Sequence, residues 1–352
     1  MQMKWELEAA RQLGINWDVK MYCPSSTIIK GSIVEFDRFI DATKINSKIA
    51  KLFAWIFFRL RYHNWLFSLQ NDVDVYILRY YVHDPFQLWF AFRSKKPVYF
   101  LHHSLEVPEL GMSSDLISII RSNLEAFIGQ FTLSAAKGLI CVTKEILAYE
   151  KKRSTLPVRE SYIYPNGIRY VELSLTDFRS ATTPELLFVA NFMPWHGLDL
   201  LLSSVKCSQQ NFLLHIVGDV SSDLLGIVGD DDRVIFHGKL NHESIIELGQ
   251  RCWIGLSSFA LHRKKMTEAC PLKVREYLMM GLPVYGDCKD VFPESCSFYG
   301  TGSESIDEIL KFARHTRGLS KSFVSNEAKG YIDKKGLLYI LYCSLSEANK
   351  SI

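Results

Sequence analysis

The residues best suited to chemistry lie in one segment of the chain, MTEACPLKVREYLMMGLPV, at positions 266–284. Its pattern predicts a short helix from about Pro271 to Met280, because proline favours the first turn of a helix and Gly281 follows the last. Lys273 lies in the first turn, three residues before Glu276, so the two side chains share one helix face. The unpaired N–H groups of a helix start attract an anion, and a lysine strengthens that attraction.

A carboxylate further along the same helix can accept two hydrogen bonds from a ribose diol. Glu276 has that position, and Glu268 lies in the loop that precedes the helix. We therefore expect a nucleoside-diphosphate site whose phosphate end is framed by Pro271, Leu272 and Lys273. The simpler interpretation is a pair of solvated glutamates on a helix surface.

Glu268 and Glu276 have the E-x7-E spacing, and the flanking EACPLKVREYLMMGLPV resembles the retaining GT-B glycosyltransferases of family 4, the glycosyl transferases group 1. The resemblance implies that Glu276 holds the ribose of a sugar nucleotide and that Glu268 lies beside the donor sugar. It also implies an α/β fold of the GT-B type. Such a fold has two Rossmann-like domains whose parallel sheets face a cleft.

A second segment, FVANFMPWHGLDLLL at 188–202, predicts a strand, a turn and a helix. A turn of this kind places backbone N–H groups at the carboxyl edge of a sheet, where α/β proteins bind ligands. It resembles the phosphate-contacting turn of the family, G-R-x-x-x-x-K-G, with Ala190 and Asn191 at the Gly-Arg positions and His196 and Gly197 at Lys-Gly. Because the usual Arg and Lys are replaced, other cations are expected to compensate. These are Lys273, Arg263, Lys264 and Lys265. The alternative is a packing turn with a surface histidine.

In the first half, a buried strand that ends in two histidines is predicted within VYFLHHSLEVPEL, at 98–110. A histidine after this strand resembles the family residue beside the transferred sugar, and His103 matches it better by position than His102. We therefore expect His103 and Glu268 to be the catalytic residues. Glu106 and Glu109 either face an acceptor or lie in a solvated loop.

Strand-like and helix-like segments alternate through the chain, which favours parallel sheets built from βαβ units. A turn signal at 164–167, resembling the PNG segment that ends the family's first domain, separates an acceptor-side domain, 1–168, from a nucleotide-sugar domain, 169–320. A helical tail, 321–352, is expected to pack back on the first domain. The chain opens with a predicted helix, Lys4 to Leu13, where the family has a strand and a glycine-rich loop. We therefore expect the first domain to lack its first strand, and we favour a coding sequence that starts further upstream over a functional loss.

Composition excludes several other classes of protein. The 352 residues carry a formal net charge of only +3 and scattered basic residues, which argues against nucleic-acid binding. Eight cysteines without a C-x-x-C pair predict buried thiols in a reducing cytoplasm. No signal peptide and no run of 18 apolar residues is recognisable. The sequence also lacks a G-x-G-x-x-G motif, which argues against a dinucleotide dehydrogenase. The aspartates at 230–232 match a metal-binding D-x-D pattern, but their polar setting favours a surface turn. No catalytic metal is therefore expected.

The helix predicted from Lys48 to Leu69 is rich in aromatic and basic residues, as in a membrane-surface helix or in a core helix with a charged rim. Taken together, the resemblance implies a cytoplasmic, metal-independent glycosyltransferase with no cofactor. A peripheral position at the inner face of a membrane is the alternative that stays open. The enzyme's partners would be a nucleotide-diphosphate sugar and a glycan or lipid-linked acceptor, with a setting in bacterial surface polysaccharide synthesis. The alternatives are a non-catalytic GT-B partner protein and a GT-B sugar-nucleotide epimerase.

Overall fold

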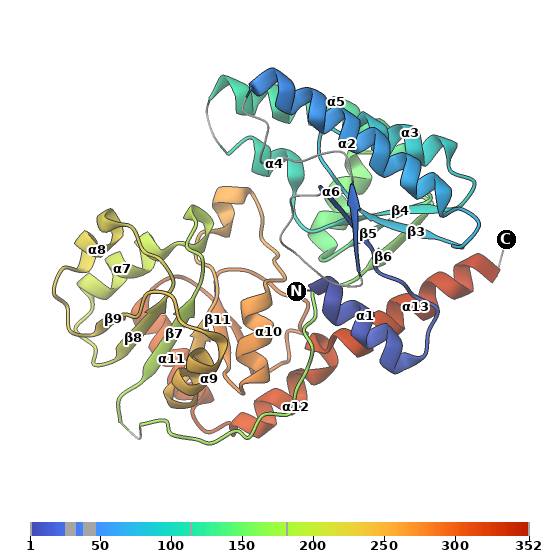
Figure 1. Cartoon of the computed structure of the whole chain (residues 1–352). Helices are drawn as coiled ribbons and strands as arrows, with labels where there is room; N and C mark the ends of the chain where they lie inside the picture. Colours follow the sequence, from blue (N-terminus) through green and yellow to red (C-terminus); the bar gives the residue numbers. More distant parts are fainter. Residues whose placement is uncertain (1, 25–32, 38–46, 113–114, 181, 351–352) are drawn as a thin grey trace. The chain divides into compact units, whose positions relative to one another are not determined.

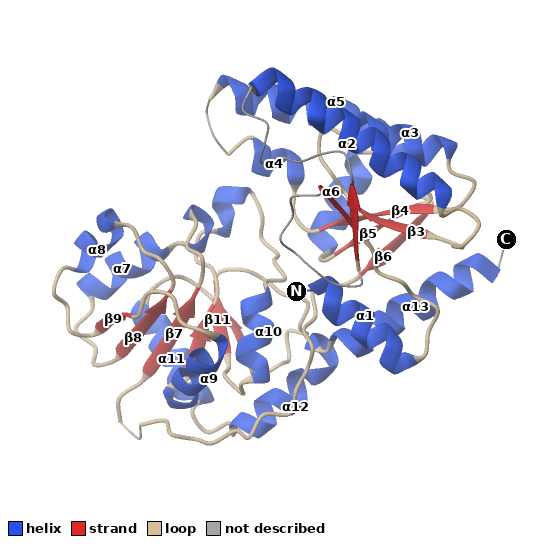
Figure 2. Ribbon diagram, viewed as in Figure 1, coloured by secondary structure: helices blue, strands red, loops and turns tan. Residues whose placement is uncertain are grey.

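The computed structural model describes residues 2–24, 33–37, 47–112, 115–180 and 182–350 (Figure 1). The chain divides into two compact units, Met1–Ile163 and Tyr164–Ile352. Each unit contains a parallel sheet with helices between successive strands (Figure 2), which is the Rossmann-like arrangement that the alternating pattern predicts.

The first unit is built around a four-stranded parallel sheet whose strands follow one another in chain order. The strands are β3 (Tyr76–Arg79), β4 (Val98–His102), β5 (Gly138–Cys141) and β6 (Glu160–Ile163). A separate parallel pair consists of β1 (Met21–Pro24) and β2 (Val34–Asp37). The helices are α1 (Gln2–Leu13), α2 (Lys48–Ser68), α3 (Pro85–Arg93), α4 (Glu106–Leu110), α5 (Leu116–Ala135) and α6 (Lys144–Arg153).

Local signals explain where these helices begin. The Asp84 side chain accepts a hydrogen bond from the N–H of Phe86, and Pro85 occupies the first helical position of α3. The predicted helices at the chain start, at 48–69 and at 114–135 are all confirmed within one or two residues.

The second unit contains a six-stranded parallel sheet in the order β12-β11-β10-β7-β8-β9. Its strands are β7 (Glu185–Val189), β8 (Leu213–Val217), β9 (Val234–Phe236), β10 (Ile254–Leu256), β11 (Val284–Gly286) and β12 (Tyr299–Thr301). The helical segments are η2 (Pro194–His196), α7 (Leu198–Cys207), α8 (Ser222–Val228), α9 (His242–Arg251), η3 (Leu261–Lys264), α10 (Leu272–Met279), α11 (Ile306–Thr316), α12 (Lys321–Ile332) and α13 (Lys334–Lys350). The last two helices therefore belong to the second unit in this division.

The strand order reverses between β7 and β10. From β7 the chain adds strands in one direction, and from β10 it adds them in the other. In open α/β sheets such a switch point leaves a crevice at the carboxyl ends of the two strands, and ligands bind there. Fully buried apolar side chains from both strands, including Leu186, Phe188 and Ile254, hold this part of the sheet rigid.

The key helix is one residue shorter at each end than predicted: Pro271 is the extended N-cap, α10 runs from Leu272 to Met279, and Gly281 follows the C-cap with a φ of +73°. A boundary difference of one residue is within the fraying of helix ends. None of the helices in the described ranges combines the length and the apolar character that a membrane crossing requires.

Candidate functional site

The loops that leave β7 and β10 lie against each other at the switch point. The N–H of Phe259 donates to the carbonyl oxygen of His196 at 3.0 Å, which joins the two loops. Gly197 follows with a φ of +68°, and a Cβ atom there would lie 2.8 Å from the carbonyl carbon of Phe259. Only glycine satisfies both the left-handed backbone and this close approach. The predicted Gly197 turn therefore starts α7 directly beside the second loop.

His196 is held as a neutral imidazole. Its Nδ1 accepts a hydrogen bond from the N–H of Met193 at 3.0 Å, so the ring proton is on Nε2. Burial, helped by the charges of Lys273 and Lys264, lowers the pKa of His196 to about 3. The residue that replaces the family's lysine is thus a neutral N–H donor, and two lysines lie close enough to act on it electrostatically.

Lys273 is the most unusual side chain in this region. Its Nζ atom is buried and has no hydrogen-bond partner among the described residues, and it lies 4.5 Å from the centroid of the Phe188 ring. Burial lowers the pKa of Lys273 to about 7. Because buried charged groups are almost always paired, an unpaired ammonium at a sheet switch point indicates the place of an anionic ligand.

Two further buried polar atoms at the carboxyl ends of β10 and β11 also lack a partner among the described residues. They are the Ser257 hydroxyl and one carboxylate oxygen, Oδ1, of Asp287. The other oxygen of Asp287 accepts from the N–H of Leu261 at 3.0 Å, and burial raises the pKa of this carboxyl. The charge of Asp287 acts on Lys273, so the lysine and the carboxylate belong to one cluster.

Glu276 lies on α10 one turn after Lys273. It is half-buried, and burial raises its pKa, whereas the charge of His242 at the start of α9 acts in the opposite direction. Its side chain is therefore partly shielded from solvent. The next residue, Tyr277, accepts a hydrogen bond at its hydroxyl from the N–H of Val189 at 2.6 Å, which fixes α10 against the end of β7.

The start of α10 is anchored by the segment 164–167, for which the sequence predicted a turn but which forms none in the structure. The side-chain amide of Asn166 donates to the carbonyl of Cys270 at 2.7 Å, and the Nε of Arg275 donates to the carbonyl of Asn166 at 3.0 Å. Arg275 is fully buried and its guanidinium also pairs with Asp290. Sequence reasoning missed Arg275. The available signal was an arginine among the residues of α10 that face the core, next to Val274 and Leu278.

Glu268 is positioned by the backbone on both sides of it. The N–H of Lys289 donates to the carbonyl of Thr267, and the N–H of Ala269 donates to the carbonyl of Lys289, both at 2.9 Å. These bonds make an isolated parallel bridge between Glu268 and the segment that follows β11. Glu268 is therefore fixed beside the same strand end as Asp287.

Arg263, an expected phosphate contact, has partners within the protein. Its guanidinium forms two hydrogen bonds with Asp199, at 3.0 and 2.7 Å, and a third with the carbonyl of Pro194 at 2.7 Å. Arg263 thus clamps η3 to the start of α7. Lys265 and Asn191 are exposed, and the cation that acts on His196 from this segment is Lys264.

In the first unit, the strand β4 ends in His102, which is fully buried. Its Nδ1 lies 3.1 Å from Glu106 and its ring stacks on Tyr80 at 4.4 Å. Burial opposes a charge on this ring, but the carboxylates of Glu106 and Glu150 raise the pKa of His102. Arg153 pairs with Glu150 at 2.7 Å and balances the second carboxylate.

This network fixes the end of β4 and so places His103, which is half-buried, immediately after it. His102, Glu106 and Glu150 also offer atoms within 4.8 Å of one another, as a metal site would. In the second unit, both carboxylate oxygens of Asp231 bind the guanidinium of Arg233, at 2.9 and 2.7 Å, which gives that aspartate a structural role in its turn.

Comparison with protein families matches residues 183–291 to the glycosyl transferases group 1. The matched stretch contains the switch point and both His196 and Lys273. Comparison with curated protein sequences gave no match.

Solved structures show the same fold at low sequence identity. The apo form of the lipopolysaccharide outer core galactosyltransferase WaaB has a TM-score of 0.59 at 14% identity, with 89% of this chain and 84% of that chain covered. HepE of Anabaena, solved with UDP and glucose, has a TM-score of 0.60 at 11% identity, with coverage of 98% and 95%. A glycosyltransferase of Rickettsia africae has a TM-score of 0.65 at 11% identity, with coverage of 100% and 95%. The chain therefore has the GT-B fold, and its matched segment and neighbours support a glycosyltransferase.

Proposed function

We propose that the protein transfers a sugar from a nucleotide-diphosphate sugar to a glycan or lipid-linked acceptor, with retention of the anomeric configuration. The observation that carries this proposal is the buried Nζ of Lys273, which has no partner among the described residues at the sheet switch point. A diphosphate supplies the charge that this ammonium lacks. Burial without such a ligand would only destabilise the protein.

The chemistry rests on stabilising the negative charge that develops on the leaving diphosphate. Lys273, the N–H groups at the start of α10 and the Nε2–H of neutral His196 are the donors that would share this charge. Because His196 carries no charge, Lys273 supplies the main cation. Glu276 would accept the two ribose hydroxyls, and their hydrogen bonds to a carboxylate would fix the nucleoside.

The remaining roles follow from the resemblance. Glu268 and His103 would flank the donor sugar, and the acceptor would attack from the face that the diphosphate leaves. We place the reaction at the cytoplasmic side of a membrane, in bacterial surface polysaccharide synthesis, and without a catalytic metal. WaaB acts on a lipopolysaccharide outer core and HepE was solved with UDP-glucose, so UDP-sugars are the first donors to try.

A thermal-shift screen of UDP-, GDP- and ADP-sugars tests the proposal. A ligand at 100 times its Kd adds about 2.7 kcal/mol of apparent stability, which is easily measured for a chain of this size. Glu276→Ala should remove the shift, whereas Glu247→Ala on α9 should preserve it. If no nucleotide sugar shifts the transition, or if Glu276→Ala leaves the shift intact, the proposal fails. For the active donor, an NMR coupling constant of the product reports the anomer.

A second function is favoured by the turn after β7. An exposed Asn191 and a neutral His196 stand where the family has two cations, and such a turn suits a non-catalytic partner that binds a nucleotide sugar weakly. Donor hydrolysis or transfer by the purified chain distinguishes the two functions, because a partner protein would bind the donor and return it unchanged. Release of an isomerised donor without any acceptor would instead indicate an epimerase.

A further inference from the structure

More than half of the exposed large apolar side chains in the described residues lie on three helices of the first unit, α2, α3 and α5. The three helices pack side by side, with α3 in contact with both others (Figure 1). On α5 the exposed apolar residues recur every three or four positions and so form one stripe along the helix. They are Leu116, Ile120, Leu124, Phe127 and Phe131.

The other two helices also expose large apolar side chains. In α2, Ile49, Leu52, Phe53 and Phe57 have helical spacing and are all more than half exposed, and in α3 Phe92 is 69% exposed. Monomeric soluble proteins rarely expose an apolar surface of this extent without a binding role.

The charges on these helices have one sign. Glu125 is the one acidic residue in their sequences, and it is fully buried and bound to Arg153 at 2.8 Å. Lys51, Arg93 and Arg121 are exposed. Apart from the exposed Asp115 that caps α5, the exposed charges on these helices are cations, and an apolar surface bordered by cations is complementary to a bilayer with anionic headgroups.

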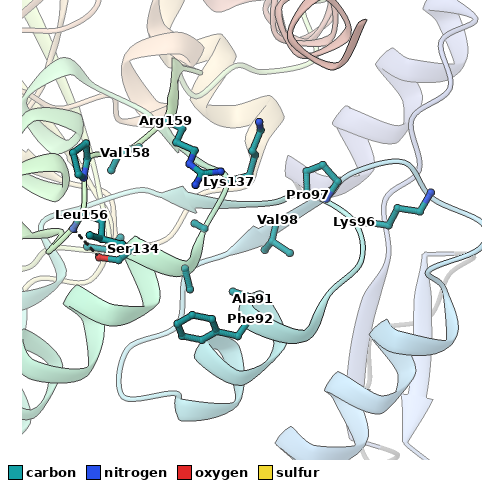
Figure 3. Close-up of a pocket in the computed structure, with 14 residues that line it drawn as sticks. Ala91, Phe92, Lys96, Pro97, Val98, Ser134, Lys137, Leu156, Val158 and Arg159 are labelled. Carbon is teal, nitrogen blue, oxygen red and sulfur yellow. Dashed lines mark hydrogen bonds between the residues drawn. The ribbon is translucent and has the colours of Figure 1, made fainter. Parts of the chain in front are cut away.

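A hollow of about 570 Å³ lies at one end of this surface (Figure 3). Phe92 of α3 and the last turn of α5 form part of its wall. Lys137 and Arg159 precede paired residues of β5 and β6, so they extend from neighbouring strand starts. Lys137 is bound to Glu160 at 2.9 Å, and Arg159 is exposed without an ion-pair partner among the described residues. The hollow is at the amino-terminal edge of the sheet, opposite to the edge where His103 lies.

We infer that the first unit binds a bilayer surface. The apolar side chains of α2, α3 and α5 enter the interface, and an anionic phosphodiester headgroup occupies the hollow beside Arg159. This inference rests on the proposed peripheral membrane role, but it requires neither sugar transfer nor a particular donor.

Sedimentation of the full chain with vesicles tests the inference. Vesicles of phosphatidylcholine, with and without phosphatidylglycerol, are compared for the wild type, for the double variant Ile120→Ser with Phe127→Ser, and for Arg159→Glu. Ile340→Ser on α13 is the matched control, because Ile340 is 60% exposed and Ile120 is 64% exposed. Substitutions at exposed positions usually change the free energy of unfolding little, so all variants should fold.

We expect the wild type and Ile340→Ser to bind the anionic vesicles. The double variant should bind them at least about tenfold more weakly, since two apolar side chains are lost from the interface, and Arg159→Glu about tenfold more weakly. Any thermal shift by a nucleotide sugar should be unchanged in every variant, which separates this result from the test of transfer activity.

Any of four results would overturn the inference. The wild type could stay in the supernatant with anionic vesicles, or the double variant could bind them as well as Ile340→Ser does. Alternatively, free glycerol 3-phosphate could compete with vesicles at equal phosphate concentration, which would make the hollow a site for soluble phosphates. A wild-type dimer in sedimentation velocity that the double variant abolishes, without vesicle binding, would assign the apolar surface to a second copy of the chain.

Discussion

Replacing Lys273 by methionine should stabilise the protein and abolish donor binding at the same time. Methionine has nearly the length of lysine and packs well against an aromatic ring such as that of Phe188. In the wild type, the buried Nζ of Lys273 has no hydrogen-bond acceptor among the described residues, so its burial lowers the free energy of unfolding. The variant removes both this cost and the cation that would hold the diphosphate.

The magnitude follows from the pKa of Lys273, which burial lowers from 10.5 to about 7. Between these values the unfolded chain binds more protons than the folded one, so the stability of the wild type rises with pH across this window. At 1.36 kcal/mol for each pKa unit, the cost is about 4 kcal/mol at pH 7, about 2 at pH 9 and close to zero above pH 10.5. The free energy of unfolding of Lys273→Met should exceed that of the wild type by up to these amounts at the corresponding pH values.

Thermal unfolding at several pH values measures the effect, with Lys311→Met on α11 as an exposed control. A gain of 1 kcal/mol raises Tm by about 2–4 °C for a unit of this size, so the predicted shift at pH 7 is several degrees. The gain should shrink between pH 7 and 9, and nucleotide sugars should no longer raise Tm. A variant that is less stable than the wild type, or that binds the donor with equal affinity, would refute this reasoning.

Three further predictions concern the same site. Donor binding near pH 8 should take up a proton, because a diphosphate raises the low pKa of Lys273; calorimetry in buffers of different ionisation enthalpy would show no buffer dependence if this is wrong. Gly197→Ala should cost more than about 1 kcal/mol in urea unfolding, since its Cβ meets the Phe259 backbone at a positive φ; an unchanged midpoint would contradict the turn geometry. Arg275→Met should cost about 3–5 kcal/mol in the same assay by leaving the buried charge of Asp290 without its partner, and a loss below about 1 kcal/mol would count against a charge effect.

The elements of the site could be predicted because their signals are local. Proline before α10 and glycine after it are each read within a few residues, and the structure has both. The turn predicted at 164–167 is not formed, although the segment does follow the last strand of the first unit. The alternation of strands and helices likewise predicted two Rossmann-like units.

The contacts within the site depend on residues that are far apart in the chain, so no local pattern could show them. Arg263 binds Asp199 across 64 positions, a contact that no local pattern shows, and its role as a phosphate ligand stays a prediction. The burial of Lys273 depends on Phe188 from another strand, and the sequence placed this lysine in an open helix turn. The exposed stripe of α5 was missed for a similar reason, because apolar spacing alone does not say which face the core covers.

The central claim is that Lys273 and Glu276, on successive turns of the same helix, bind one nucleoside diphosphate, Lys273 at the diphosphate and Glu276 at the ribose. A crystal structure of the protein with the nucleotide sugar that gives the largest thermal shift tests it most directly. We predict a phosphate oxygen within hydrogen-bond distance of the Lys273 Nζ and both ribose hydroxyls on the Glu276 carboxylate. A nucleotide bound elsewhere, with Lys273 still unpaired, would contradict the account.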